Sequence, residues 1–157
     1  RTWGETTCGI NGEMIVVEVD VANGNFNFEI VGLADTAVKE SRERVRSAIK
    51  NSSCKFPDQH ITVNLAPADL KKDGSGLDLP IAIGILAAQA RLELPKDDAP
   101  VFVGELALDG SLRPVSGILP MIYEHGTKGG EASLFPQQCR GRGTRRWHQC
   151  FYGPSFK

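Results

Sequence analysis

The stretch from residue 65 to residue 88, LAPADLKKDGSGLDLPIAIGILAA, constrains the fold more than any other part of the chain. Residues 79–90 are almost wholly apolar, and a helix that is apolar all round must be buried on every side. We predict that Asp78 caps this helix, and Pro80 follows in the first turn, where its missing N–H has no cost. Helix N-termini stabilise anions and activated nucleophiles, so Ser75 is a candidate active-site residue.

Length and composition predict a soluble globular protein. The chain has 157 residues, of which 41% are hydrophobic and 24% charged, enough for one domain, or one domain plus a tail. No apolar run reaches the roughly 18 residues of a membrane span, and no segment is typical of a signal peptide. The cysteines are Cys8, Cys54, Cys139 and Cys150. Because they lack CxxC pairing, we expect reduced thiols in a cytoplasmic protein. Cys139, His148 and Cys150 fit no usual zinc spacing, so no metal site is predicted.

A basic, glycine-rich segment occupies residues 126–157. Six of its residues are Lys or Arg and only Glu131 is acidic. Arginines interleaved with aromatic residues could form a nucleic-acid arm, because arginine neutralises phosphate and aromatic rings stack on bases. The segment has neither helical nor strand periodicity, and its composition changes near Pro136, which favours a disordered end. We therefore expect a folded domain at residues 1–125 and a poorly ordered tail at residues 126–157.

Alternating strands and helices are predicted before this tail, each bounded by turn-forming residues. The expected elements are a strand at 15–21, a hairpin turn at Asn23-Gly24, a strand at 26–30, a helix capped by Asp35 or Thr36 and running to about Lys50, a strand at 61–65, the buried helix at 79–90, a strand at 101–108, a hairpin turn at Asp109-Gly110, a strand at 112–115 and a helix from Gly117 or Pro120. The order ββαβαββα predicts an α/β sandwich, in which helices pack on one mixed sheet.

Three long strings in this region resemble a single family. They are VEVDVANGNFNFEIVGLADTAVKESRERVRSAIKNS, ITVNLAPADLKKDGSGLDLPIAIGILAA and VFVGELALDGSLRPVSGILPM. Together they resemble the N-terminal domain of the bacterial Mg-chelatase-like AAA+ ATPases, the family of the competence protein ComM, also called YifB. The resemblance covers residues 1–123 and implies a Lon-protease-like fold of the ribosomal protein S5 domain 2 type.

The resemblance also implies a function. In this family the domain precedes an AAA+ ATPase module, and the whole protein is expected to be a cytoplasmic homo-hexameric motor that moves DNA branches during recombination and natural transformation. The implied partners are that module and, through the full-length protein, DNA; no membrane is implied. The chain lacks the GxxxxGK[ST] phosphate loop, so we expect no cofactor in this fragment, and ATP and Mg²⁺ only in the module. A Mg-chelatase-type motor of tetrapyrrole synthesis is an alternative.

The similarity to the family ends near Gln138. SLFPQQ at residues 133–138 is still similar, whereas CRGRGTRRWHQCFYGPSFK at residues 139–157 is not. A reading-frame shift near Gln138 would produce such an arginine-rich, patternless end. This hypothesis is tested by sequencing the coding DNA.

The family resemblance implies a degenerate protease site. Active Lon-type proteases use a serine at the start of the buried helix and a lysine from the following helix as its base. Matching the strings places the serine position at Gly76 and the lysine position at Leu119, so both required side chains are missing. A one-residue slip would bring Ser75 into place, but Lys128 lies too far along the chain to be its base. We expect a non-catalytic domain, with a serine peptidase of unusual dyad as the alternative.

Several charged residues have both a functional and a structural interpretation. The candidates for contacts to DNA or a neighbouring subunit are Lys39, Arg42, Arg44, Arg46, Lys71 and Lys72. Glu40 and Glu43 interleave with four of them, and mixed charge usually marks a solvated helix surface. Lys71 and Lys72 are expected to be solvated, and His60 and His125 to be structural. The carboxylates that could suggest a Mg²⁺ site are Asp73, Asp78 and Asp109, which turn and N-cap hydrogen bonding explains better.

Overall fold

The computed structural model describes residues 1–8, 11–89 and 101–115. Its elements are β1 (Thr2–Cys8), β2 (Asn11–Ala22), β3 (Asn27–Val31), α1 (Thr36–Asn51), β4 (His60–Ala66), α2 (Asp78–Ala88), β5 (Val101–Phe102), β6 (Glu105–Leu106) and β7 (Leu112–Arg113). The predicted final helix, the lysine position at Leu119 and the tail at 126–157 lie outside these ranges. Within them, no helix is long and apolar enough to cross a membrane.

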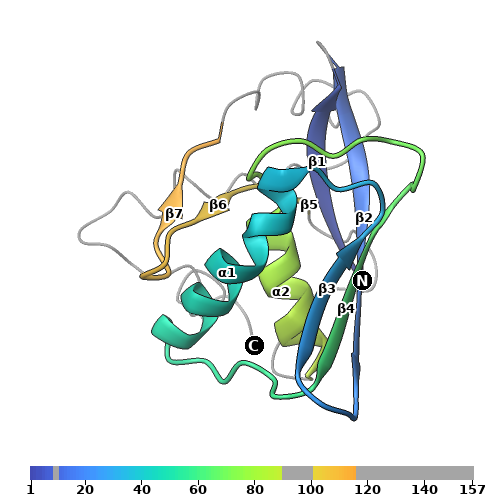
Figure 1. Ribbon diagram of the computed structural model, residues 1–157. Coiled ribbons are helices and arrows are strands. Elements are labelled where there is room, and N and C mark those ends of the chain that lie inside the picture. Colours follow the sequence, from blue (N-terminus) through green and yellow to red (C-terminus); the bar gives the residue numbers. More distant parts are fainter. Residues whose placement is uncertain (9–10, 90–100, 116–157) are drawn as a thin grey trace, which may run out of the picture.

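A mixed five-stranded sheet forms one layer, and both helices lie against the same side of it (Figure 1). The strand order is β3-β4-β2-β1-β5. The strands β1, β2 and β4 pair antiparallel, whereas β3 joins β4 and β5 joins β1 in parallel. The predicted α/β class, with helices on one mixed sheet, is therefore confirmed.

The strongest periodic segments fold as predicted. Ile61, Val63 and Leu65 of β4 are fully buried, and α2 is buried around its whole circumference from its first residue to Leu86. The helix α1 begins after Asp35, whose Oδ1 accepts a hydrogen bond of 2.7 Å from the Val38 N–H. This bond satisfies one of the free N–H groups in the first turn. Both helices thus have the positions that their apolar patterns predict.

The prediction that Asp78 caps α2 is wrong. The N-cap position is Leu77, and no side chain makes a capping hydrogen bond there. Asp78 is instead the first helical residue, and its side chain is fully buried. A buried carboxylate needs partners of its own, and these partners come from elements distant in the sequence.

The predicted hairpin at Asn23-Gly24 is also wrong. The chain turns there, with Gly24 at a φ of 156°, but β3 does not pair with β2, because β4 lies between them. The apolar residues of β4 are fully buried, which suits a central strand. Glu29 and Val31 of β3 are exposed, which suits an edge. The Asn-Gly pair predicts that the chain turns, but it does not determine which strands pair; here β4, which comes later in the sequence, pairs with both β2 and β3.

The predicted strand at 101–108 is divided in two. Gly104 donates its N–H to the Gly76 carbonyl at 2.9 Å and accepts from the Leu79 N–H at 3.1 Å. These bonds take the chain out of the main sheet after β5 and into a separate hairpin of β6 and β7. The turn of that hairpin is the predicted Asp109-Gly110, where Gly110 has a φ of 85°. The strand β1 was not predicted, because its inward residues Thr2 and Thr6 are polar.

Candidate functional site

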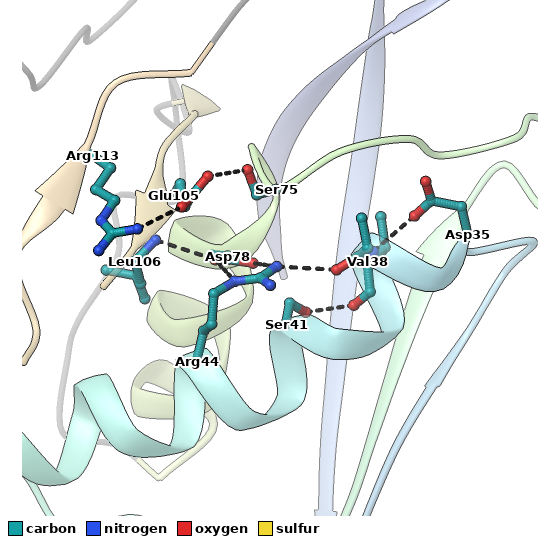
Figure 2. Close-up of polar contacts among 10 residues, drawn as sticks. Asp35, Val38, Ser41, Arg44, Ser75, Asp78, Glu105, Leu106 and Arg113 are labelled. Atoms are coloured by element: carbon teal, nitrogen blue, oxygen red, sulfur yellow. Dashed lines mark hydrogen bonds and ion pairs between the residues drawn. The ribbon is translucent and has the colours of Figure 1, made fainter. Parts of the chain in front are cut away.

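The candidate site lies where the loop before α2 meets β6 (Figure 2). The Ser75 hydroxyl donates a hydrogen bond to Oε2 of Glu105. The other oxygen of this carboxylate, Oε1, lies 3.5 Å from Nη1 of Arg113 on β7. The partner of the serine is therefore a carboxylate that is itself paired with a cation.

This arrangement orients the serine hydroxyl but does not make it a strong nucleophile. Activation requires a base that can remove the hydroxyl proton near neutral pH, such as a histidine or a desolvated lysine. The described side-chain partner of Ser75 is instead the carboxylate of Glu105. The contacts of Ser75 therefore match a structural hydrogen bond between the loop and β6 better than peptide hydrolysis.

The backbone around Gly76 would leave room for a nucleophile. A Cβ at this position would lie 3.5 Å from Cγ1 of Val103 and 3.9 Å from Cγ1 of Val115, which are ordinary contacts. The Gly76 carbonyl is meanwhile held by the N–H of Gly104. Crowding therefore does not exclude a serine at position 76, which the family resemblance assigns to the nucleophile.

Lys72 differs from its expected state. We expected this side chain to be solvated, but it is fully buried, and its Nζ donates to the Pro67 carbonyl. Burial lowers the pKa of Lys72, because a low-dielectric surrounding disfavours the ammonium form. Its backbone also bridges Leu33 and Asp35, with N···O distances of 3.3 and 3.1 Å. Lys72 thus fastens the loop to the start of α1, and its described side-chain bond goes to Pro67 and not to Ser75.

Lys71, by contrast, is exposed as expected. Its Nζ lies 3.0 Å from Oδ1 of Asp73, and both side chains are more than half exposed. The hydrogen bond to Asp73 raises the pKa of Lys71. Such an exposed pair has little effect on stability.

A buried ion pair crosses from α1 to α2 beside the candidate site (Figure 2). Nε and Nη2 of Arg44 donate to the Asp78 carboxylate at 2.7 and 3.0 Å. The Leu106 N–H donates to the same carboxylate at 3.2 Å. Burial raises the pKa of Asp78, and the hydrogen bonds from Arg44 act in the opposite direction. The sequence contains one signal for this pair: Asp78 is a single acidic residue at the start of an otherwise apolar helix.

Comparison with known proteins identifies the family. The model of the family described as subunit ChlI of Mg-chelatase matches residues 17–139. The chain belongs to this family. This ChlI-family chain is 48% identical over 120 residues to the competence protein ComM of Haemophilus influenzae, covering 76% of the chain and 24% of that protein. It is 52% identical over 116 residues to the uncharacterised protein YifB of Escherichia coli, covering 74% and 23%.

A more distant likeness reaches the Lon proteases. Lon protease 2 of Bacillus subtilis is 24% identical over 144 residues, covering 82% of the ChlI-family chain and 26% of that protein. The chain thus spans about a quarter of the length of the curated relatives it matches. The predicted resemblance to the Mg-chelatase-like family, and the Lon-like character of its fold, are confirmed.

The basic candidates of this ChlI-family domain separate into two groups. Arg44 is bound to Asp78, and Lys72 is buried, which leaves neither free to meet a phosphate backbone. Lys39 and Arg42 are exposed and Arg46 is half-buried. Among the described residues, no cluster of three or more His, Cys, Asp or Glu is placed to hold a metal ion. Asp109 accepts hydrogen bonds from the Ser111 N–H and hydroxyl at 2.9 and 2.7 Å, as a turn residue does.

Proposed function

We propose that this domain is a non-catalytic, Lon-like accessory module of a Mg-chelatase-like AAA+ ATPase that acts on branched DNA. The observation that carries the proposal is the pairing of Ser75 with Glu105, next to a glycine at the nucleophile position. The protease framework remains, and the residues that would perform hydrolysis are replaced. In the full-length protein, the domain would help a homo-hexameric ring in the cytoplasm to assemble or to engage DNA during recombination and natural transformation.

ATP and Mg²⁺ belong, in this proposal, to the ATPase module and not to this domain. The glycine-rich turn at residues 73–78 does not fit a nucleotide. Its nearest buried lysine, Lys72, is directed to the Pro67 carbonyl, and the Asp78 N–H already donates to the Ser75 carbonyl at 3.2 Å. A phosphate loop requires an outward row of N–H groups and a lysine that reaches the phosphates. No step of ATP hydrolysis is therefore assigned to these residues.

A serine-directed probe distinguishes the accessory module from a peptidase. We expect a fluorophosphonate probe to leave the wild-type chain unlabelled, because Glu105 does not activate the Ser75 hydroxyl. Intact-mass spectrometry would detect one added probe per chain. Labelling that Ser75→Ala abolishes, and that the control Ser111→Ala leaves unchanged, would overturn the non-catalytic assignment in favour of a peptidase.

Binding of branched DNA tests the other half of the proposal. We expect the full-length hexamer to bind a four-way junction at least about tenfold more weakly after deletion of residues 1–125, since the domain would contribute to engagement. Fluorescence anisotropy at one fixed salt concentration measures the change, because phosphate contacts depend strongly on salt. Unchanged affinity in a deletion variant that remains hexameric contradicts a role in DNA engagement. Metal-insertion partners in place of DNA would favour the chelatase motor.

A further inference from the structure

The strand β3 is an open edge of the main sheet among the described residues. Residues of a strand alternate in the direction of their backbone groups. The Asn27 N–H points toward β4 and donates to the carbonyl of Gln59, the residue before that strand. Phe28 and Ile30 therefore direct their N–H and C=O groups outward. The Phe28 carbonyl confirms this direction, because it accepts a hydrogen bond of 3.2 Å from Nη1 of Arg42. Edge groups that no described strand pairs are a template for an added strand.

A row of cations follows this edge along α1. Lys39, Arg42, Arg46 and Lys50 are separated by three, four and four residues, a spacing that places them on one side of a helix. We call them the basic row. The guanidinium Cζ of Arg46 lies 4.7 Å from the centre of the Phe26 ring, and Arg42 reaches Phe28. Arg42 and Arg46 therefore lie against the β3 edge, and Lys39 and Lys50 extend the basic row along the same side of α1.

Exposed apolar side chains lie at both ends of the same edge. Phe26 is 41% exposed, Val31 44% and Leu33 57%. In the described part of the chain these are three of four large hydrophobic residues that are so exposed. Leu33 also has a φ of 53°, a left-handed conformation that is rare for a leucine. Phe26 packs edge-on against the core residue Phe56, whereas Val31 and Leu33 lie outside the described core cluster, and a docked partner would cover them.

We propose that the β3 edge binds an extended, acidic segment of a partner polypeptide as an added strand. The added backbone would pair with Phe28 and Ile30, displacing Arg42 from the Phe28 carbonyl. Every second side chain of the segment would face the basic row, and acidic residues there would match its charge. The alternate side chains would face Val31 on the other side. This is the known physical mode of strand addition, in which the backbone gives affinity and alternate side chains give specificity.

The combination of features favours a polypeptide over a nucleic acid. A phosphate backbone would satisfy the cations of the basic row, but an ionised phosphodiester has no hydrogen-bond donor for the outward C=O groups of Phe28 and Ile30. It would also leave Val31 and Leu33 exposed to water. An acidic strand satisfies the charges, the backbone groups and the apolar side chains together. The inference does not depend on the proposed role of the domain in an ATPase, because it concerns a different surface.

A decapeptide in which glutamate alternates with valine, labelled with fluorescein, provides the test. We expect it to bind the wild-type chain, and K39E/K50E to weaken binding by about tenfold, since two attractive charges become repulsive. Both residues are exposed and have no described ion pair. The control R1E/K55E changes the net charge equally at two exposed residues outside the basic row, and it should leave affinity unchanged. Thermal melts verify that both variants fold.

Two N-methylated peptides test the strand geometry. Successive amide N–H groups of the bound peptide would point alternately toward β3 and away from it. Methylating every second amide would therefore block pairing with β3 in one peptide and leave it intact in the other. We expect one peptide to lose binding and the other to retain it, with the Phe28 and Ile30 amide signals shifting on binding in NMR spectra. Equal binding of both N-methylated peptides would overturn strand addition, as would no binding of the parent peptide. Displacement of that peptide by a duplex DNA oligonucleotide, or a dimer that K39E/K50E dissociates, would assign the edge to another occupant.

Discussion

Gly32→Ala is expected to destabilise the domain by about 4 kcal/mol, through left-handed backbone strain combined with overpacking. Gly32 has a φ of 102°, which disfavours any residue with a Cβ. An added Cβ would lie 2.1 Å from the carbonyl oxygen of Leu65 and 3.0 Å from its nitrogen. Those atoms belong to β4, which pairs on both sides and has little freedom to move. Urea denaturation followed by circular dichroism measures the loss.

Gly74→Ala is the matched control for this substitution. Gly74 also has a positive φ, 83°, but no atom lies within 4 Å of an added Cβ. It should therefore show the conformational penalty alone, about 1 kcal/mol. A large difference between the two variants measures the clash with β4. Equal losses would mean that the chain at Gly32 can move away from Leu65.

The requirement for glycine at position 32 could not be predicted from the sequence around it. The cause is Leu65, which comes after α1 in the sequence but lies on β4, directly beside β3, in the structure. The local patterns did predict α1, β4 and α2, because a periodic arrangement of apolar residues specifies a helix or a strand by itself. They did not predict which strands pair, because the choice between β2 and β4 as the neighbour of β3 depends on burial of the whole sheet.

The candidate site shows the same division between local and distant causes. The glycine-rich turn and the buried helix could be predicted from consecutive residues, whereas the assignment of Gly76 to the nucleophile position rests on the family resemblance. The buried state of Lys72 could not, because it depends on how the loop packs against Leu33 and Asp35. The partner of Asp78 was equally hidden, since Arg44 lies 34 residues away in sequence, on a helix whose neighbouring charges suggest solvent.

The ion pair of Arg44 and Asp78 gives the second large prediction. Arg44→Ala is expected to cost about 3–5 kcal/mol, because it leaves a fully buried carboxylate without its cation. Chemical denaturation at pH 7 measures the loss. Arg42→Ala, which removes a surface hydrogen bond to the Phe28 carbonyl, should cost about 1 kcal/mol. Similar losses for both arginines would contradict a special role for the buried pair.

The loss caused by Arg44→Ala should shrink as the pH falls from 7 toward 5. Burial already raises the pKa of folded Asp78 above its ordinary value of 3.8, and Arg44 opposes that rise. Without Arg44 the folded pKa rises further, so the folded chain takes up a proton before the unfolded chain does. Stability then increases on acidification through the folded pKa. A loss that stays constant between pH 7 and pH 5 would mean that water or another cation solvates the carboxylate.

Replacing both partners separates charge from packing. Arg44→Leu/Asp78→Leu removes the buried charges together, and replacing a buried ion pair by apolar residues is often nearly neutral in stability. The double variant should therefore be more stable than Arg44→Ala, despite carrying one more substitution. It should also lose the pH dependence assigned to Asp78. The Leu106 N–H would then lack its acceptor, so we expect a residual loss of stability of about 1–3 kcal/mol. This loss would weaken the contact between α2 and β6 beside Ser75.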